Sequence, residues 1–137
     1  ATPTRTPTVT PTVPSGLWSS RAGDVNDDRG HAVAVDGSGN VAVTGHYEGI
    51  TDFGNGLVTS YTHPSLGPTR DVFVARYNST GGHIWSRSIG GVGKEEGNAV
   101  ATDSSGNVVI TGYSESFEID FGGGTNGSLA GACSMRP

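Results

Sequence analysis

The sequence predicts an all-β protein built from copies of one antiparallel sheet, and three observations lead to that prediction. The 33 residues at 17–49 are repeated without a gap 67 residues later, at 84–116. Both copies contain short runs of Val, Ala and Thr between turn-forming residues. The 137 residues include 23 glycines, and only 33% of them are apolar, which favours short strands and tight turns over long helices.

The repeat itself indicates the kind of architecture. Of the 33 overlaid positions 16 are identical, among them Trp18 with Trp85 and Gly30 with Gly97. A tandem repeat of this length is typical of folds in which one supersecondary unit stacks on the next. Residues that recur at the same position are most economically structural, so we expect function where the two copies differ.

Each copy contains two strands around a tight turn. Residues 31–36 and 41–47 are β-type runs, and 98–103 and 108–113 are their counterparts. The aspartate before the turn can hydrogen-bond back to the chain, the glycine can take a positive φ, and the asparagine tolerates the left-handed region. We assign these structural turn roles to Asp36, Gly39, Asn40, Asp103, Gly106 and Asn107.

Two further strands complete a sheet. Residues 71–77 and 83–89 follow as β-type runs, so 31–36, 41–47, 71–77 and 83–89 make four consecutive antiparallel strands. Their apolar residues lie on both faces, which predicts a sheet covered on both sides. Repeated four-stranded sheets of this kind are the blades of a β-propeller. The period exceeds the usual blade of about 40 to 50 residues, and the surplus lies in the connection at 50–70.

Several short stretches together resemble a known repeat. They are residues 32–45 (AVAVDGSGNVAVTG), 71–82, 84–91 and 99–112, with the tripeptide DFG at 52–54 and again at 120–122. Over residues 17–122 the chain resembles the secreted bacterial β-propeller repeats (SBBP repeats). The resemblance implies a repeat of large exported or surface proteins and brings no shared catalytic residues. Arg76 stands where the pattern usually has Lys, and the chain leaves the pattern after residue 124.

The predicted organisation has three parts. Residues 1–16 form a Thr/Pro-rich linker or extended arm, and 123–137 form an irregular tail. Between them, 17–122 contain an outer strand at 17–22, a full blade at 31–89 and a partial blade at 98–122. Adding the period to Asp71 places the next third strand beyond residue 137, so the sequence predicts an incomplete propeller of about one and a half to two blades, where closure needs about four to eight.

Three explanations of the incomplete ring stay open. The chain is a piece of a longer propeller, or several copies close a ring, or copies join head to tail into a fibre. In the fibre, the N-terminal segment of one copy completes the blade of the next. Residues 8–13 have strand propensity for this, although their proline restricts them to an edge.

Charge and composition exclude several classes of partner. The net charge is -5, and the eight Lys and Arg residues are scattered, which disfavours nucleic acid and anionic membranes. No apolar run approaches the length of a membrane span. The Thr/Pro tract is typical of stalks in exported proteins, which predicts an extracellular or cell-surface location.

The loop at 24–28 is the one candidate for a cofactor. Asp24, Asn26 and Asp28 offer alternate oxygen ligands, as in the first half of a calcium loop. Arg29 stands where that loop has its glycine, and Val35 where it has its closing glutamate. An acidic surface loop is therefore the favoured interpretation, and weak Ca²⁺ binding is the hypothesis. We predict no other cofactor.

The two tryptophans are candidates for ligand binding. Trp18 and Trp85 each begin an outermost strand. A tryptophan wedged between blades is the favoured interpretation, and an aromatic side chain that grips a glycan is the alternative.

The histidines and hydroxyl residues offer no recognisable chemistry. His31, His46, His63 and His83 lack metal-type spacing, so we interpret them as solvated or packed on turns. Local sequence indicates no Ser/His/Asp set, and we predict no catalytic residue.

The sequence therefore predicts a non-enzymatic extracellular β-propeller-repeat module that serves as a structural or binding scaffold at the cell surface. The first alternative is a subunit that self-assembles into a filament or closed ring by complementing strands or blades between copies. The second is a lectin-like module that binds carbohydrate. The expected partners are accordingly other copies, the remainder of a longer propeller, or glycans.

Overall fold

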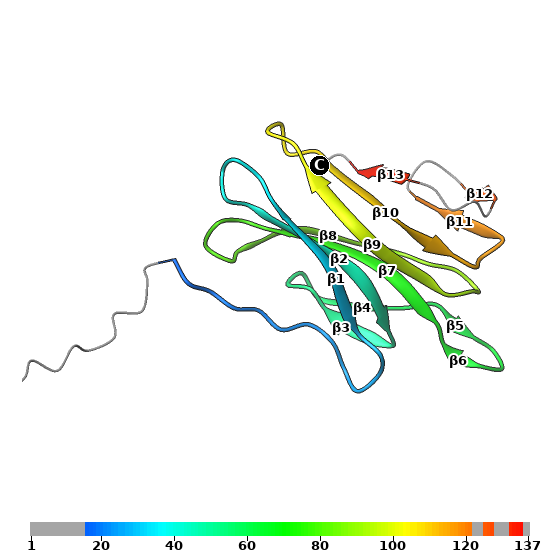
Figure 1. The fold of residues 1–137 in the computed structure, drawn as a ribbon. Helices are drawn as coiled ribbons and strands as arrows, with labels where there is room; N and C mark the ends of the chain where they lie inside the picture. Colours follow the sequence, from blue (N-terminus) through cyan, green and yellow to red (C-terminus); the bar gives the residue numbers. More distant parts are fainter. Residues whose placement is uncertain (1–15, 122–124, 128–131, 136–137) are drawn as a thin grey trace, which may run out of the picture.

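The computed structural model describes residues 16–121, 125–127 and 132–135, and these form strands and turns with no helix (Figure 1). The predicted all-β class is confirmed. The described residues accordingly offer no helix that is long and apolar enough to cross a membrane. The strands are β1 (Arg29–Val35), β2 (Val41–Glu48), β3 (Ile50–Asp52), β4 (Leu57–Thr59), β5 (Thr62–His63), β6 (Gly67–Pro68), β7 (Arg70–Tyr77), β8 (His83–Ile89), β9 (Glu95–Thr102), β10 (Val108–Ser114), β11 (Glu118–Asp120), β12 (Thr125–Gly127) and β13 (Ala132–Met135).

The first blade is a four-stranded antiparallel sheet in the order β1-β2-β7-β8. These are the four strands that the sequence predicts, with ends shifted by at most two residues. The long connection between β2 and β7 contains two small hairpins, β3–β4 and β5–β6. The surplus length of the repeat therefore adds structure at one end of the blade and leaves its strand order unchanged.

The second blade is a three-stranded sheet in the order β13-β10-β9. β13 pairs with β10 as β7 pairs with β2, because Met135 lies opposite Val108 and Tyr77 lies opposite the equivalent Val41. The hairpin β11–β12 likewise takes the place of β3–β4. The expected irregular tail at 123–137 thus differs from the structure: a shorter connection, 115–131 instead of 49–69, supplies a third strand before residue 137.

The expected outer strand at 17–22 also differs from the structure, in which these residues form no strand. Their counterpart β8 is a strand because it pairs with β7. Sixty-seven residues before β7 stands the Thr/Pro tract at 3–10, where proline lacks the N–H that a ladder needs. The tract itself lies outside the described residues.

The two blades pack face to face, with β9 against β1, β2 and β7 (Figure 1). We call this side of the first blade the closed face. Its apolar cluster joins four residues of the first blade to three that follow it: Ala42, Val72, Val74 and Ile89 with Val108, Ile110 and Ile119. Trp85, Val100 and Phe121 pack at the edge of this cluster.

The opposite side of the first blade, which we call the open face, is covered differently. Its cluster is aromatic and consists of Tyr47, Phe53, Phe73, Ala75 and Tyr77, with Trp18, Val43 and Val58 packed against it. The cover consists of the segment that holds Trp18 and of the hairpin β3–β4, whose turn holds Phe53. No further blade covers this face among the described strands. A hollow of about 280 Å³ remains between Trp18, Gly30, Phe73 and Tyr77.

Candidate functional site

The boundary between the two blades holds polar groups at both of its ends. At one end β7 begins with Arg70, which donates hydrogen bonds to Asp27 and, at 2.9 Å, to Glu96 of β9. At the other end Arg76 donates to the Asp36 carboxylate at 2.7 Å and to the carbonyl of Gly106 at 2.6 Å. Arg70 and Arg76 of β7 therefore hydrogen-bond to the second blade at both ends of the closed face.

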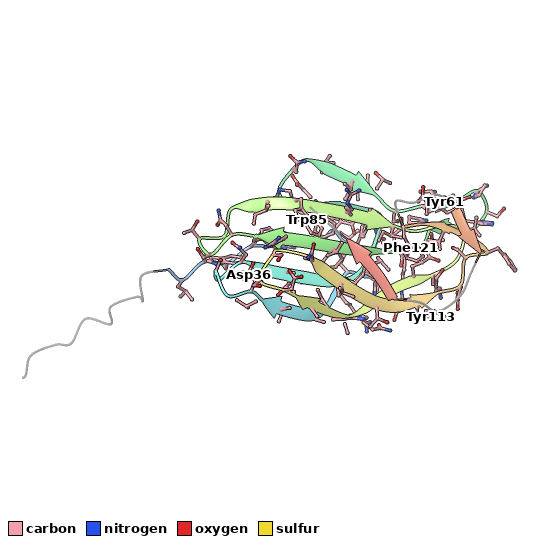
Figure 2. All side chains as sticks on the ribbon, turned by 90° about the horizontal axis from the view of Figure 1, so that it is seen from above. Asp36, Tyr61, Trp85, Tyr113 and Phe121 are labelled. Atoms are coloured by element: carbon pink, nitrogen blue, oxygen red, sulfur yellow. The ribbon has the colours of Figure 1, made fainter. Side chains whose placement is uncertain are left out.

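Arg76 bonds to Asp36, which belongs to the turn that the sequence predicts. The Asp36 carboxylate accepts bonds from the N–H groups of Ser38 and Asn40 and from the Asn40 side-chain amide. The Asn40 amide, the backbone donors and Arg76 together hold the pKa of Asp36 at about 2. Asp36 lies at the opposite end of the blade from Tyr61 (Figure 2).

The glycine of this turn takes a positive φ, 79° at Gly39 and 83° at its counterpart Gly106. No residue other than glycine does so in the described part of the chain, so Asn40 and Asn107 are not left-handed there. Their amides instead donate to Asp36 and Asp103 at 2.9 and 2.7 Å. The asparagine side chain therefore serves the turn as a hydrogen-bond donor.

The Arg70 end contains a histidine that the sequence interpretation places wrongly. His46 lies in the middle of β2, is only 1% exposed and is therefore neither solvated nor on a turn. Neither ring nitrogen has a hydrogen-bond partner. Nε2 lies 3.5 Å from an Asp27 oxygen and Nδ1 lies 3.8 Å from Glu96 Oε1, and both distances exceed a normal hydrogen bond.

His31 lies beside His46 because of a β-bulge. The register of β1 against β2 shifts between Gly30 and Ala32, which leaves His31 as the extra residue, and Asn98 of β9 is its bulged counterpart. The two bulges meet between the blades, where His31 Nδ1 lies 3.3 Å from Asn98 Oδ1. The His31 and His46 rings meet edge to face at 5.0 Å. Bulges redirect side chains in this way at functional sites.

His31, His46 and Glu96 each place one ligand atom within 4.8 Å of the others. Burial lowers the pKa of His46, nearby Arg70 lowers it further, and the carboxylates of Asp27 and Glu96 only partly oppose this effect. The imidazole is therefore neutral at neutral pH, so it is a potential ligand rather than a cation.

Sequence reasoning missed this group because its members come from three strands. One signal was available in the sequence, because the two copies differ at all three positions: Asn98 is the equivalent of His31, Tyr113 of His46, and Arg29 of Glu96.

Two buried carboxyl groups, Asp71 of β7 and Glu95 of β9, stand next in sequence to Arg70 and Glu96. Glu95 accepts bonds from the Ser116 hydroxyl at 2.6 Å and from the Gly91 N–H at 3.0 Å. Asp71 accepts one bond from the Tyr61 N–H, while its second oxygen has no partner. Burial raises the pKa of Asp71 to about 7.

The predicted calcium loop is cross-linked by its own side chains. Asp24 accepts from the Asn26 N–H at 2.7 Å and from the Ile50 N–H at 3.0 Å, and Asp28 accepts from the Asp24 N–H at 2.8 Å. The first two of these bonds, Asn26 before Ile50, lower the pKa of Asp24. Glu95 plays the part of Asp28 in the second copy. These bonds account for the loop's acidic residues, and Ca²⁺ binding there stays a prediction.

The tryptophans occupy equivalent places on successive boundaries. Trp85 packs at the edge of the closed-face cluster, and Trp18 packs on the open face with its ring 5.8 Å from that of Tyr77. Figure 2 marks Trp85 on the first blade and Phe121, which the same cluster includes. Both rings are half-buried. Glycan binding by Trp18 or Trp85 stays a prediction.

The comparisons with known proteins agree with a repeat of blade type. No family model matches the sequence, and no solved structure matches it. The chain is similar to an uncharacterized WD repeat-containing protein, L264, of Acanthamoeba polyphaga mimivirus, with 28% identity over 85 residues. The match covers 59% of this chain and 6% of that protein, so the chain spans a small part of its length. WD repeats are β-propeller repeats, so the chain resembles a propeller-type repeat protein.

Proposed function

We propose that this chain is a non-enzymatic β-propeller-repeat module that serves as a structural or binding scaffold, and that its open face takes a further blade. The similarity to a WD repeat-containing protein supports the general class. The location at the cell surface rests on the Thr/Pro tract and on the resemblance to secreted bacterial repeats.

The observation that carries the proposal is a pair of equivalent glycines. A Cβ on Gly97 would lie 2.2 Å from the Thr44 hydroxyl across the closed face, so this position must lack a side chain for the blades to meet. A Cβ on Gly30 would meet nothing closer than 3.9 Å. Gly30 lines the hollow of the open face. Glycine thus also occupies the equivalent position on the open face, where a further blade would have to approach as closely as the second blade does at Gly97.

The location is tested by surface proteolysis. Intact cells of the organism that makes the protein are treated with protease, and the chain is followed with an antibody against residues 17–49. We expect the epitope to disappear from intact cells while a cytoplasmic marker survives. An epitope that is cut only after lysis would contradict the cell-surface part of the proposal.

A second candidate is self-assembly, in which the further blade belongs to another copy. Residues 17–22 (LWSSRA) match β8 (IWSRSI, 84–89) but form no strand, and no described strand pairs with the outer edge of β13. In the first blade β8 occupies that position beside β7. Residues 17–22 of one copy could therefore add a fourth strand to the three-stranded sheet of another copy, beside β13.

Light scattering over a range of concentrations tests self-assembly. Discrete small oligomers would indicate a ring, and filaments that grow with concentration would indicate a fibre. Gly30→Val should abolish either form without unfolding the chain, because the added atoms obstruct only the open face. Val25→Glu, at a fully exposed position in the loop before β1, is the matched control. A monomer at every concentration would rule out self-assembly and leave a blade of a longer chain as the partner.

A further inference from the structure

We propose that His31, His46 and Glu96 form a binding site for a divalent first-row transition ion of the Zn²⁺ type, which links the two blades. The site goes beyond the scaffold function and does not depend on it. His31 comes from the bulge of β1, His46 from the centre of β2 and Glu96 from β9. An ion held by all three would join the first blade to the second.

The buried histidine is the strongest support. His46 is 1% exposed, and its two ring nitrogens are buried without hydrogen-bond partners. A buried polar group that lacks a partner costs about 1–3 kcal/mol, so such groups usually have a specific explanation. Nδ1 is the nitrogen that lies toward Glu96, at 3.8 Å from its oxygen. An ion between them would give that nitrogen the partner that the protein does not provide.

The other nitrogen fits the same explanation. Nε2 lies 3.5 Å from Asp27, so a small movement would let its N–H donate to that carboxylate. Histidines that bind metals commonly donate their second N–H to a carboxylate, which fixes the tautomer and orients the ring. Asp27 is thus a positioning residue for His46.

The donor set selects the class of ion. Two imidazoles and one carboxylate are the three protein ligands of many zinc sites, with water in the fourth position. Ca²⁺ and Mg²⁺ prefer oxygen ligands only, so this set disfavours them. The ligand atoms lie within 4.8 Å of one another. Tetrahedral ligands with bonds of about 2.0–2.2 Å lie about 3.3–3.6 Å apart, so the three side chains would draw closer by up to about 1.5 Å to hold the ion.

Arg70 is the competitor of the ion. Its guanidinium holds both Glu96 and Asp27, and it brings a positive charge to the same carboxylates. The Glu96 oxygen nearest to His46 Nδ1 is Oε1, which also accepts from Arg70, so an ion at that position would share this oxygen with Arg70. We therefore expect the affinity to be limited by Arg70 and to rise when Arg70 is replaced by Gln.

The test is isothermal titration of the full chain with ZnCl₂ after removal of metals, with Cys133→Ser as the background to exclude the thiol. We expect one Zn²⁺ per chain. His31→Asn introduces the residue of the second copy at an exposed position, so the fold should survive. It should weaken Zn²⁺ binding by more than about tenfold, which is the least that changes beside metal ligands cost.

His63→Asn and His83→Asn are the matched controls and should bind Zn²⁺ as the parent does. Glu96→Gln should weaken binding, and Arg70→Gln should strengthen it, with circular dichroism as the check of folding. Unchanged affinity in His31→Asn, or loss of binding in either control, would overturn the assignment. Absence of a saturable 1:1 event in the parent would overturn the site altogether.

Discussion

The two faces of the first blade use the same strands and opposite residues, yet they are covered in different ways. The closed face joins small aliphatic residues to a second sheet, and the arginines of β7 fasten it at both ends. The open face is aromatic, and Val33 beside its rim is 64% exposed. The difference indicates that the repeat specifies a boundary between neighbouring blades. The closed face is a complete boundary of this kind, and the open face is a boundary that is only partly covered.

The largest expected effect comes from emptying the closed face. Ile110→Ala removes a buried side chain between the sheets, and we expect the free energy of unfolding to fall by about 2–5 kcal/mol. Val33→Ala, on the open side, should change it by no more than about 0.5 kcal/mol. Urea unfolding followed by tryptophan fluorescence measures both. Equal losses would mean that the two faces are packed alike.

The equivalent glycines should respond with opposite signs. Gly97→Ala forces a methyl group against Thr44, and we expect a loss of about 1–3 kcal/mol from overpacking. Gly30→Ala has space for its methyl group and restricts the unfolded chain, so a gain of about 0.4–1 kcal/mol is expected. The measurement is the shift in urea midpoint of the monomeric chain. A loss of the same size at Gly30 would show that the open face is already occupied.

The buried carboxyl group of Asp71 gives a pH test at the end of the same blade. Its pKa is raised from 3.8 to about 7, so the folded state holds a proton that the unfolded state has released. Stability from this group is therefore present below pH 3.8 and is lost as the pH rises toward 7, by at most about 1.4 kcal/mol per pH unit.

Asp71→Asn keeps an acceptor for the Tyr61 N–H and removes the titration. Between pH 4 and 7 the unfolding free energy of the parent should fall relative to that of the variant with this slope. Parallel curves would contradict the raised pKa.

A small effect is also expected from the hydrogen bond at the edge of the open face. The Tyr47 hydroxyl lies 2.6 Å from that of Ser88, and Tyr47→Phe should cost about 1 kcal/mol because water can still serve Ser88. Tyr113→Phe, at a 45% exposed ring on the second blade, is the matched control and should change little. Thermal unfolding resolves the pair. A larger loss in Tyr113→Phe would mean that its hydroxyl is buried by an association.

Particular residues show how far the sequence alone could go. The turns at Asp36 and Asp103 were predictable because their hydrogen bonds are local, within four residues. The four strands of the first blade were predictable because both a period and a pattern of apolar residues mark them. The third strand of the second blade was not, because residues 132–135 lack that pattern and only the edge of β10 gives them a partner.

The sequence by itself determined the repeating blade and its local turns, since each depends on short-range geometry repeated at a fixed period. The close approach of Gly97 to Thr44 is visible only in the structure, because the two residues belong to different blades. Only the tertiary structure decided which residues meet between the blades. His31, His46 and Glu96 are far apart in the chain and come together because two bulges and a buried strand face one another. The same packing separates the faces, because a second sheet covers one of them and a single extended segment with a small hairpin covers the other.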